Sequence, residues 1–246
     1  MVFIDVHAHL DYSKNVAGKV ERAKEAGVEI IVSNGTDKKS NRKVMEIVGE
    51  FDEVKAALGI YPLDALKMSS VELDEEIEFI RDNEEDIVAI GEVGIDQKEK
   101  KDLDKQKENF QKFIKLAMDL DKPIIVHSRK AEKEAIKMLE ESGIKKVVMH
   151  CFSGKSSLVN KIVKNGWMFS VPTNVVYSDQ MRSLVKRAPI AQILCETDSP
   201  FMHPEKKRNN EPKNVIEGYK IIARIKGMKL EEVEEQVEEN YKSMFG

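Results

Sequence analysis

Residues 123–150 read PIIVHSRKAEKEAIKMLEESGIKKVVMH. The stretch begins with an apolar run at Pro123 to His127 and ends with a second apolar run at Lys146 to His150. Short apolar runs of this kind are typical of parallel strands that are covered on both faces. The charged segment between them, Ala131 to Ser142, predicts a helix that ends at Gly143. The stretch therefore predicts a strand–helix–strand unit in which both strands end in a histidine.

The same alternation of apolar runs and amphipathic segments continues along the whole chain. The other apolar runs are Val2 to Val6, Glu29 to Ser33, Val54 to Gly59, Ile87 to Gly91, Trp167 to Val171 and Ile190 to Cys195. The intervals between their carboxyl ends are long enough for one strand, one helix and two short loops. Eight such units without a break predict a closed TIM (β/α)8 barrel rather than an open sheet, with residues 1–246 as a single domain.

Capping residues mark several of the predicted helices. Ser69 and Glu72 have the spacing of a capping box, which predicts a helix starting near Val71. The segment from Val215 to Phe245 predicts two helices separated near Gly227, which we expect to cover the last strand and one end of the barrel.

The composition excludes several classes of protein. The chain has 40 Lys and Arg against 44 Asp and Glu, and 41% of its residues are hydrophobic. These values exclude a strongly basic nucleic-acid coat protein and a disordered chain. Cys151 and Cys195 are too few for a disulfide scaffold and predict buried, reduced thiols. Because we find neither a charged leader nor an apolar run of about 18–20 residues, we expect a cytoplasmic protein without membrane contact. No obligate protein partner is indicated.

Four of the five histidines fall at the carboxyl ends of predicted strands: His7 and His9 at the first, His127 at the fifth and His150 at the sixth. Active sites of such barrels lie at these ends of the strands. Two histidines at i and i+2 of an extended chain point in the same direction, so both imidazoles can reach one ion. Histidines with only structural roles would be scattered, whereas these predict a metal site on one rim.

Two carboxylates follow other strands of the same barrel. Four imidazoles and two carboxylates are too many ligands for one tetrahedral ion with an open position. They suffice for two ions about 3.5–4 Å apart that share a carboxylate and a water. Because the first and last strands meet when a barrel closes, we expect His7, His9 and Asp198 at the first ion, His127 and His150 at the second, and Glu92 between the two.

These motifs resemble the TatD family of metal-dependent hydrolases, within the amidohydrolase-type barrels. The matching stretches are FIDVHAHL at 3–10, IGEVGID at 90–96, HSR at 127–129, HCFSG at 150–154, ETDSP at 196–200 and NEP at 210–212. The resemblance implies a TIM-like barrel, a pair of divalent cations and phosphodiester hydrolysis, often as a deoxyribonuclease that trims single strands from the 3′ end. The implied ligands are the same six residues, His7, His9, Glu92, His127, His150 and Asp198. Glu92, where related barrels often carry a carboxylated lysine, favours the phosphoesterase branch.

Two positions depart from the family pattern. The chain has Tyr61 where the family usually has the histidine of Gly-x-His-Pro, and Gln97 where many relatives have an aromatic residue. A tyrosine can donate a hydrogen bond to a phosphate oxygen, but it is not a cation near neutral pH. His203, in the loop after the eighth strand, is a candidate to replace the missing imidazole; the alternative is a solvated loop histidine.

The predicted reaction is phosphodiester hydrolysis by a hydroxide that bridges two metal ions. We expect Asp198 to accept the proton of the attacking water and Glu92 to bridge the ions. Arg129 can bind two phosphate oxygens with its planar guanidinium, or form a surface ion pair. The nitrogen-rich ligand set suits Zn, Mn, Co or Fe better than Mg alone, although the carboxylates leave Mg open. The expected substrate is single-stranded DNA or another small phosphodiester, and residues 206–208, Lys-Lys-Arg, are candidate phosphate contacts.

Two other functions use the same residues. A metal-dependent ester or amide hydrolase, such as an aminoacyl-RNA deacylase, would direct the same hydroxide at a carbonyl carbon. A non-catalytic metal-binding or adaptor protein is disfavoured because the ligand set is complete. A Cys–His hydrolase built on Cys151 and His150 is excluded, because adjacent residues of a strand point to opposite faces.

Overall fold

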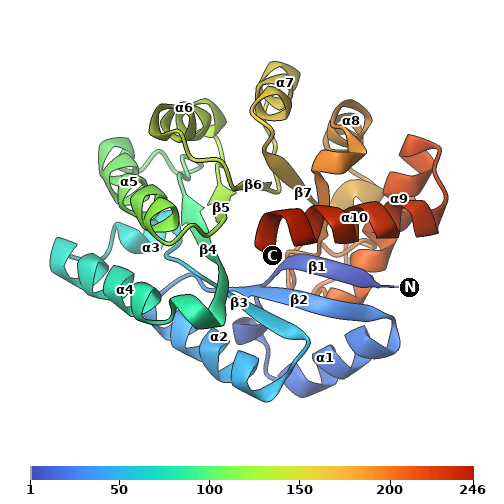
Figure 1. Cartoon of the computed structure of the whole chain (residues 1–246), viewed down its shortest axis with the longest axis horizontal. Coiled ribbons are helices and arrows are strands. Elements are labelled where there is room, and N and C mark those ends of the chain that lie inside the picture. The colour runs from blue at the N-terminus through green and yellow to red at the C-terminus, as the bar shows by residue number, and fades with distance from the viewer. Residues whose placement is uncertain (1) are drawn as a thin grey trace.

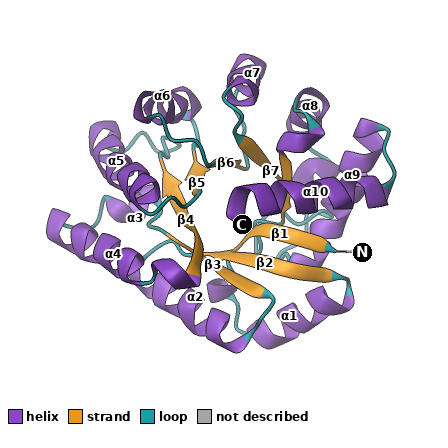
Figure 2. Cartoon of the chain, in the orientation of Figure 1, coloured by secondary structure: helices purple, strands orange, loops and turns teal. Residues whose placement is uncertain are grey.

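The computed structural model describes residues 2–246 and shows a barrel of parallel strands surrounded by helices (Figures 1 and 2). The strands are β1 (Phe3–Ala8), β2 (Val28–Asn34), β3 (Val54–Leu58), β4 (Ile87–Gly94), β5 (Ile124–His127), β6 (Val147–His150), β7 (Met168–Pro172) and β8 (Ile193–Glu196). They pair in sequence order from β1 to β8, and every ladder is parallel. The predicted (β/α)8 barrel is confirmed.

The barrel closes between β1 and β8 through contacts near the carboxyl ends of these strands. An isolated parallel bridge joins Ala8 to Ser199, and the backbone amide of Asp198 donates to the carbonyl of His7 over 2.9 Å. Below these contacts, the buried carboxyl group of Asp5 accepts hydrogen bonds from the amide and the hydroxyl of Thr197, at 2.9 and 2.5 Å. The closure therefore places the segment after β8 directly beside the end of β1.

The helices cover the outside of the barrel, as Figure 2 shows. They are α1 (Val16–Glu25), α2 (Lys38–Glu50), α3 (Pro62–Ala65), α4 (Ser70–Asp82), α5 (Leu103–Asp119), α6 (Glu132–Ser142), α7 (Ser156–Lys164), α8 (Asp179–Arg187), α9 (Val215–Lys226) and α10 (Leu230–Phe245). Short 3-10 helices are η1 (Leu10–Tyr12), η2 (Glu84–Asp86), η3 (Thr173–Val176), η4 (Ile190–Gln192) and η5 (Pro212–Asn214). The last two helices contact β1 and β8, as expected.

The local signals of the sequence agree with most element boundaries. The capping box of Ser69 and Glu72 is formed, and Gly143 and Gly227 end their helices with φ of 75° and 67°. The predicted start of the eighth strand at Ile190 is wrong, because the amide of Gln192 donates to the carbonyl of Pro189 and the chain first forms η4. β8 begins only at Ile193. Among the described residues, we find no helix that is both long and apolar enough to cross a membrane.

β4 extends beyond its predicted end and approaches β5 closely. A Cβ atom at Gly94 would lie only 2.0 Å from the carbonyl oxygen of His127, and the φ of this glycine is +142°. Glycine is required at such a backbone contact because it has no side chain. The close approach brings Glu92 on β4 beside the imidazole of His127.

Candidate metal centre

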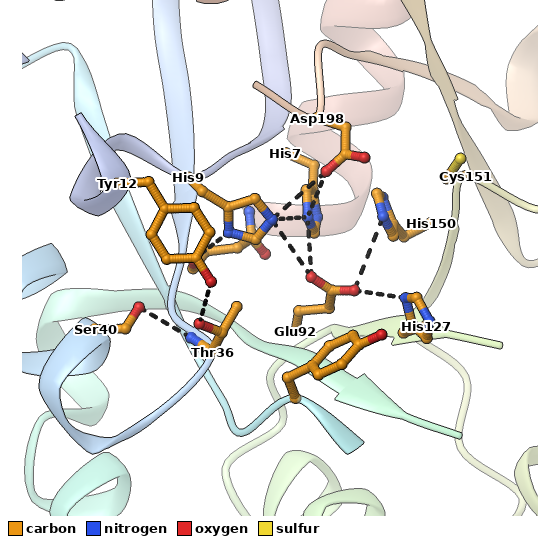
Figure 3. A network of polar contacts seen from close by, with 12 residues as sticks. His7, His9, Tyr12, Thr36, Ser40, Glu92, His127, His150, Cys151 and Asp198 are labelled. Carbon is orange, nitrogen blue, oxygen red and sulfur yellow. Dashed lines mark hydrogen bonds and ion pairs between the residues drawn. The ribbon is translucent and has the colours of Figure 1, made fainter. Parts of the chain in front are cut away.

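The structure brings the six predicted ligands together at the carboxyl ends of the strands (Figure 3). They come from β1 and the residue after it, from β4, β5 and β6, and from the segment after β8: His7, His9, Glu92, His127, His150 and Asp198. Five of them are buried, while the side chain of His127 is 14% exposed. Side chains from opposite ends of the chain therefore converge on one site.

Four donor atoms form the first group in this site. The Nε2 atoms of His7 and His9 lie 3.3 Å apart, and Oε2 of Glu92 lies 3.4 and 3.5 Å from them. Oδ1 of Asp198 lies 3.9 and 3.5 Å from the same two nitrogens. Metal–ligand bonds of about 2.0–2.2 Å put neighbouring tetrahedral donors about 3.3–3.6 Å apart. The spacing of this donor group therefore fits one ion.

The other carboxylate oxygen of Glu92 faces a second group. Its Oε1 lies 2.7 Å from Nδ1 of His127 and 3.9 Å from Nε2 of His150. Nitrogen and carboxylate donors of these three residues could hold a further ion. Glu92 thus directs one oxygen at each group, which is the placement expected of a bridging carboxylate. The ligand roles of the six residues remain predictions.

Three of the four histidines have a hydrogen-bond partner on the nitrogen that faces away from the neighbouring donors. The pairs are His9 Nδ1 with the carbonyl of Asn34 at 2.9 Å, His150 Nδ1 with Glu196 at 2.8 Å, and His127 Nε2 with Asp96 at 3.1 Å. Such partners fix the orientation of the ring and leave the other nitrogen free for an ion. This pattern is typical of metal-ligating histidines.

Sequence reasoning missed the two carboxylates in these pairs, Glu196 and Asp96. Glu196 lies two residues before Asp198, so the period of an extended chain already places both on one face. Asp96 ends the family-like stretch at 90–96. In both cases the residue type and the position at a strand end were visible in the sequence. The histidine that each one contacts depends on the pairing of the strands.

Burial and charge give the imidazoles of this site unequal proton affinities. Burial disfavours a proton on His150, but the charge and hydrogen bond of Glu196 outweigh it and raise the pKa to about 10. Burial also opposes a proton on His9, yet the hydrogen bond with Asp198 and the charge of Glu92 raise its pKa to about 9. Burial and the charge of His150 lower the pKa of His7 to about 3. Without cations, this site therefore holds protons on His9 and His150 at neutral pH.

The carboxylates of the site stay ionised in the same network. Burial acts to raise the pKa of Glu92, but hydrogen bonds with His127 and His7 hold it well below the usual range. For Asp198 the hydrogen bond with His9 likewise outweighs burial, and the pKa is lowered. A buried group of carboxylates balanced by protonated imidazoles is suited to exchange these protons for cations.

A cavity of about 590 Å³ opens above this cluster. Arg129 is exposed and lines the cavity two residues after His127. Tyr61 also lines it, but its hydroxyl donates a 2.5 Å hydrogen bond to Asp96, the carboxylate that contacts His127. The residue that replaces the family histidine is thus tied to the site through Asp96.

The candidate substrate contact His203 and the departure from the family pattern at Gln97 both form local hydrogen bonds. Among the described residues, His203 is not one of those that line the cavity, and its Nδ1 accepts a hydrogen bond from the amide of Glu205. The side-chain amide of Gln97 donates to the carbonyl of Lys101. Cys151 lines the cavity as a free thiol, and burial raises its pKa well above the usual value. Such a thiol is a poor nucleophile.

A (β/α)8 barrel with histidines and carboxylates gathered at this rim defines the class of metal-dependent barrel hydrolases. Comparison with known families agrees with this class. The sequence model described as TatD related DNase matches residues 4–246. The chain belongs to the TatD family, as its motifs predicted.

Individual relatives resemble the chain over nearly its whole length. It is 32% identical to human deoxyribonuclease TATDN3, covering 98% of this chain and 94% of that protein. It is 35% identical to the uncharacterized metal-dependent hydrolase YabD of Bacillus subtilis, covering 99% of each. Among solved structures, the TatD homologue YJJV of Escherichia coli superposes with a TM-score of 0.91 at 25% identity, covering 99% of this chain and 97% of that one.

Proposed function

We propose that the protein is a divalent-metal-dependent phosphodiesterase that degrades single-stranded DNA from the 3′ end. The observation that carries this proposal is the placement of Glu92, whose two oxygens face two separate groups of histidines. Relatives named as deoxyribonucleases and metal-dependent hydrolases support the same class of reaction. The cavity above the cluster gives an extended substrate access to these donors.

Two divalent cations per chain are proposed at this site. His7, His9 and Asp198 would hold one, His127 and His150 the other, and Glu92 both. Bound there, the cations would lower the pKa of a water molecule and polarise the phosphoryl oxygens. The mixture of imidazole and carboxylate donors fits Zn, Mn, Co or Fe and leaves Mg open.

The side chains around the centre have separate tasks in this proposal. Asp198, ionised and buried beside His9, accepts the proton of the attacking water. Arg129 binds two oxygens of the substrate phosphate from the exposed side of the cavity. His203 remains a candidate for contact with a longer strand, since its loop borders the cavity through Phe201 and Met202.

The test uses protein that is stripped of metal and then reloaded with each cation separately. Elemental analysis should give two cations per chain, and hydrolysis of end-labelled single-stranded DNA should exceed that of aminoacyl esters. Asp198→Asn should lower kcat by about 10²- to 10⁴-fold. Glu92→Gln should also lower the metal content, while Glu235→Gln on the exposed face of α10 should match the wild type.

Two results would overturn the proposal. If Asp198→Asn hydrolysed DNA at nearly the wild-type rate, Asp198 would not be the proton acceptor. Faster turnover of aminoacyl esters than of any phosphodiester would assign the same centre to an ester hydrolase.

A further inference from the structure

One side of the cavity is aromatic and exposed, in contrast to the polar cluster beneath it. Tyr12 is 50% exposed and Phe201 is 52% exposed, and both line the cavity. Their ring centroids lie 6.3 Å apart with the planes at 82°. Exposed aromatic rings that gather at one cavity mark a binding site more often than isolated ones do.

This aromatic corner, formed by Tyr12 and Phe201, adjoins the first donor group. The ring of Tyr12 stacks on the imidazole of His9, with the ring centroids 5.3 Å apart and the planes at 20°. Figure 3 shows these two rings next to each other. Phe201 contacts the same imidazole edge to face, at 6.2 Å. A phosphate held over the donor groups would therefore have the base of an adjoining nucleotide against the two rings.

The ring of Tyr12 and the backbone that carries the ring of Phe201 are held in place before any ligand binds. The hydroxyl of Tyr12 shares a 2.9 Å hydrogen bond with the hydroxyl of Thr36. The backbone amide of Phe201 donates to the carbonyl of Asp198 over 2.7 Å. Side chains that are held before binding lose less conformational entropy when the ligand binds, which favours affinity.

Positive charge follows Phe201 in the same loop, at residues 206–208. The ammonium of Lys206 sits 4.7 Å from the ring centroid of Tyr177, and residues 206–208 are exposed. Aromatic rings combined with lysine and arginine side chains are the usual surface for single-stranded nucleic acids. Paired bases within a duplex are stacked on their neighbours and offer no free face, whereas an unpaired base does.

Building on the proposed function, we propose that Tyr12 and Phe201 form a subsite that stacks an unpaired nucleobase beside the scissile phosphate. The ligand is a base of single-stranded DNA, read by its aromatic face rather than by its hydrogen-bonding edge. The subsite gives the enzyme its preference for single strands over duplexes. Base identity has little effect, because every base has such a face.

The experiment measures stacking directly, apart from hydrolysis. A phosphorothioate-linked oligonucleotide carries 2-aminopurine at its 3′ end, because the fluorescence of this base falls when it stacks on an aromatic ring. The wild-type protein, loaded with metal, should quench the fluorescence and bind about 5- to 150-fold more tightly than it binds the matching abasic strand. Phe201→Leu and Tyr12→Leu should lose both effects.

Three control variants separate stacking from general damage to the fold. Phe201→Tyr and Tyr12→Phe keep an aromatic ring and should retain the quenching. Met118→Ala changes an exposed side chain on α5 and should behave as the wild type.

The outcomes distinguish this inference from the proposed function. If the wild type cleaves DNA but binds abasic strands equally well, the stacking subsite is wrong and the phosphodiesterase stands. If the wild type quenches 2-aminopurine through Phe201 but cleaves no phosphodiester, the subsite stands and the proposed reaction is wrong. Quenching that persists in both leucine variants overturns the subsite.

Discussion

The Oε2 atom of Glu196 lies 2.8 Å from Nδ1 of His150, at the buried end of β8. Its other oxygen accepts a hydrogen bond from the amide of Cys151. Glu196 therefore orients the imidazole and makes it a stronger base, while Nε2 of His150 stays directed at Glu92. This carboxylate supports the candidate centre without belonging to the six predicted ligands.

Replacing Glu196 with glutamine should weaken metal binding by about 10- to 100-fold, because a neutral amide supports the imidazole less well. The fold should survive, since a glutamine oxygen can still accept from Cys151. Competition with a chromophoric chelator measures the change, and Glu235→Gln serves as the matched control. Unchanged affinity in Glu196→Gln would show that the contact with His150 is irrelevant to metal binding.

Tyr61→Phe should remove one hydrogen bond and leave the ring in place. Burial acts to raise the pKa of Asp96, but hydrogen bonds from His127 and Tyr61 lower it to about 2. Loss of the hydroxyl should loosen the Asp96–His127 pair and lower kcat by about 10-fold, as expected for a hydrogen bond to a charged group. Tyr177→Phe makes the same chemical change on an exposed ring and should leave kcat unaltered. Equal kcat values for the two variants would exclude a positioning role for Tyr61.

Metal binding should release protons at pH 7 and become tighter as the pH rises. Without cations His9 and His150 have pKa values of about 9 and 10, so both must lose a proton to bind a cation. A histidine whose pKa is higher in the folded than in the unfolded protein stabilises the fold when it is protonated. For His9 and His150 this contribution is complete below the unfolded pKa of about 6.5 and is lost as the pH rises through about 9–10. The gain in Tm on adding metal should therefore increase from pH 6 to pH 9.

Titration calorimetry in buffers of different ionisation enthalpy counts the released protons. Affinity that falls with rising pH, or binding without proton release, would contradict the two raised values.

Thr197→Val should destabilise the protein by opening the contact between β8 and β1. Valine has the same shape but cannot donate to the buried carboxyl group of Asp5. Burial raises the pKa of Asp5 to about 8, so this carboxyl is mostly protonated at pH 7. A lost hydrogen bond to a buried polar group costs about 1–3 kcal/mol, and each kcal/mol lowers Tm by about 2–4 °C in a chain of this size. Urea and thermal unfolding measure the effect, with Ser157→Ala on the exposed face of α7 as the control. A Tm within about 1 °C of the wild-type Tm would show that the contact is dispensable.

The sequence alone determined the alternation of strands and helices, several helix ends and the convergence of the histidines. These features depend on the short repeats of strand and helix and on residues such as Ser69 and Gly143, whose effects act within a few positions. His7 and His9 could be placed on one face because an extended chain repeats every two residues. Because the carboxyl ends of all eight strands lie on one rim of the barrel, Glu92 and Asp198 could be predicted to lie in the same metal site.

Only the tertiary structure decided which atoms meet across the barrel. It paired His150 with Glu196, turned Tyr61 toward Asp96 and placed Phe201 beside Tyr12. These pairs are far apart in the chain, so no local periodicity contains them. They depend on the register of the ladders and on the closure of β8 against β1, which the packing of the whole barrel sets.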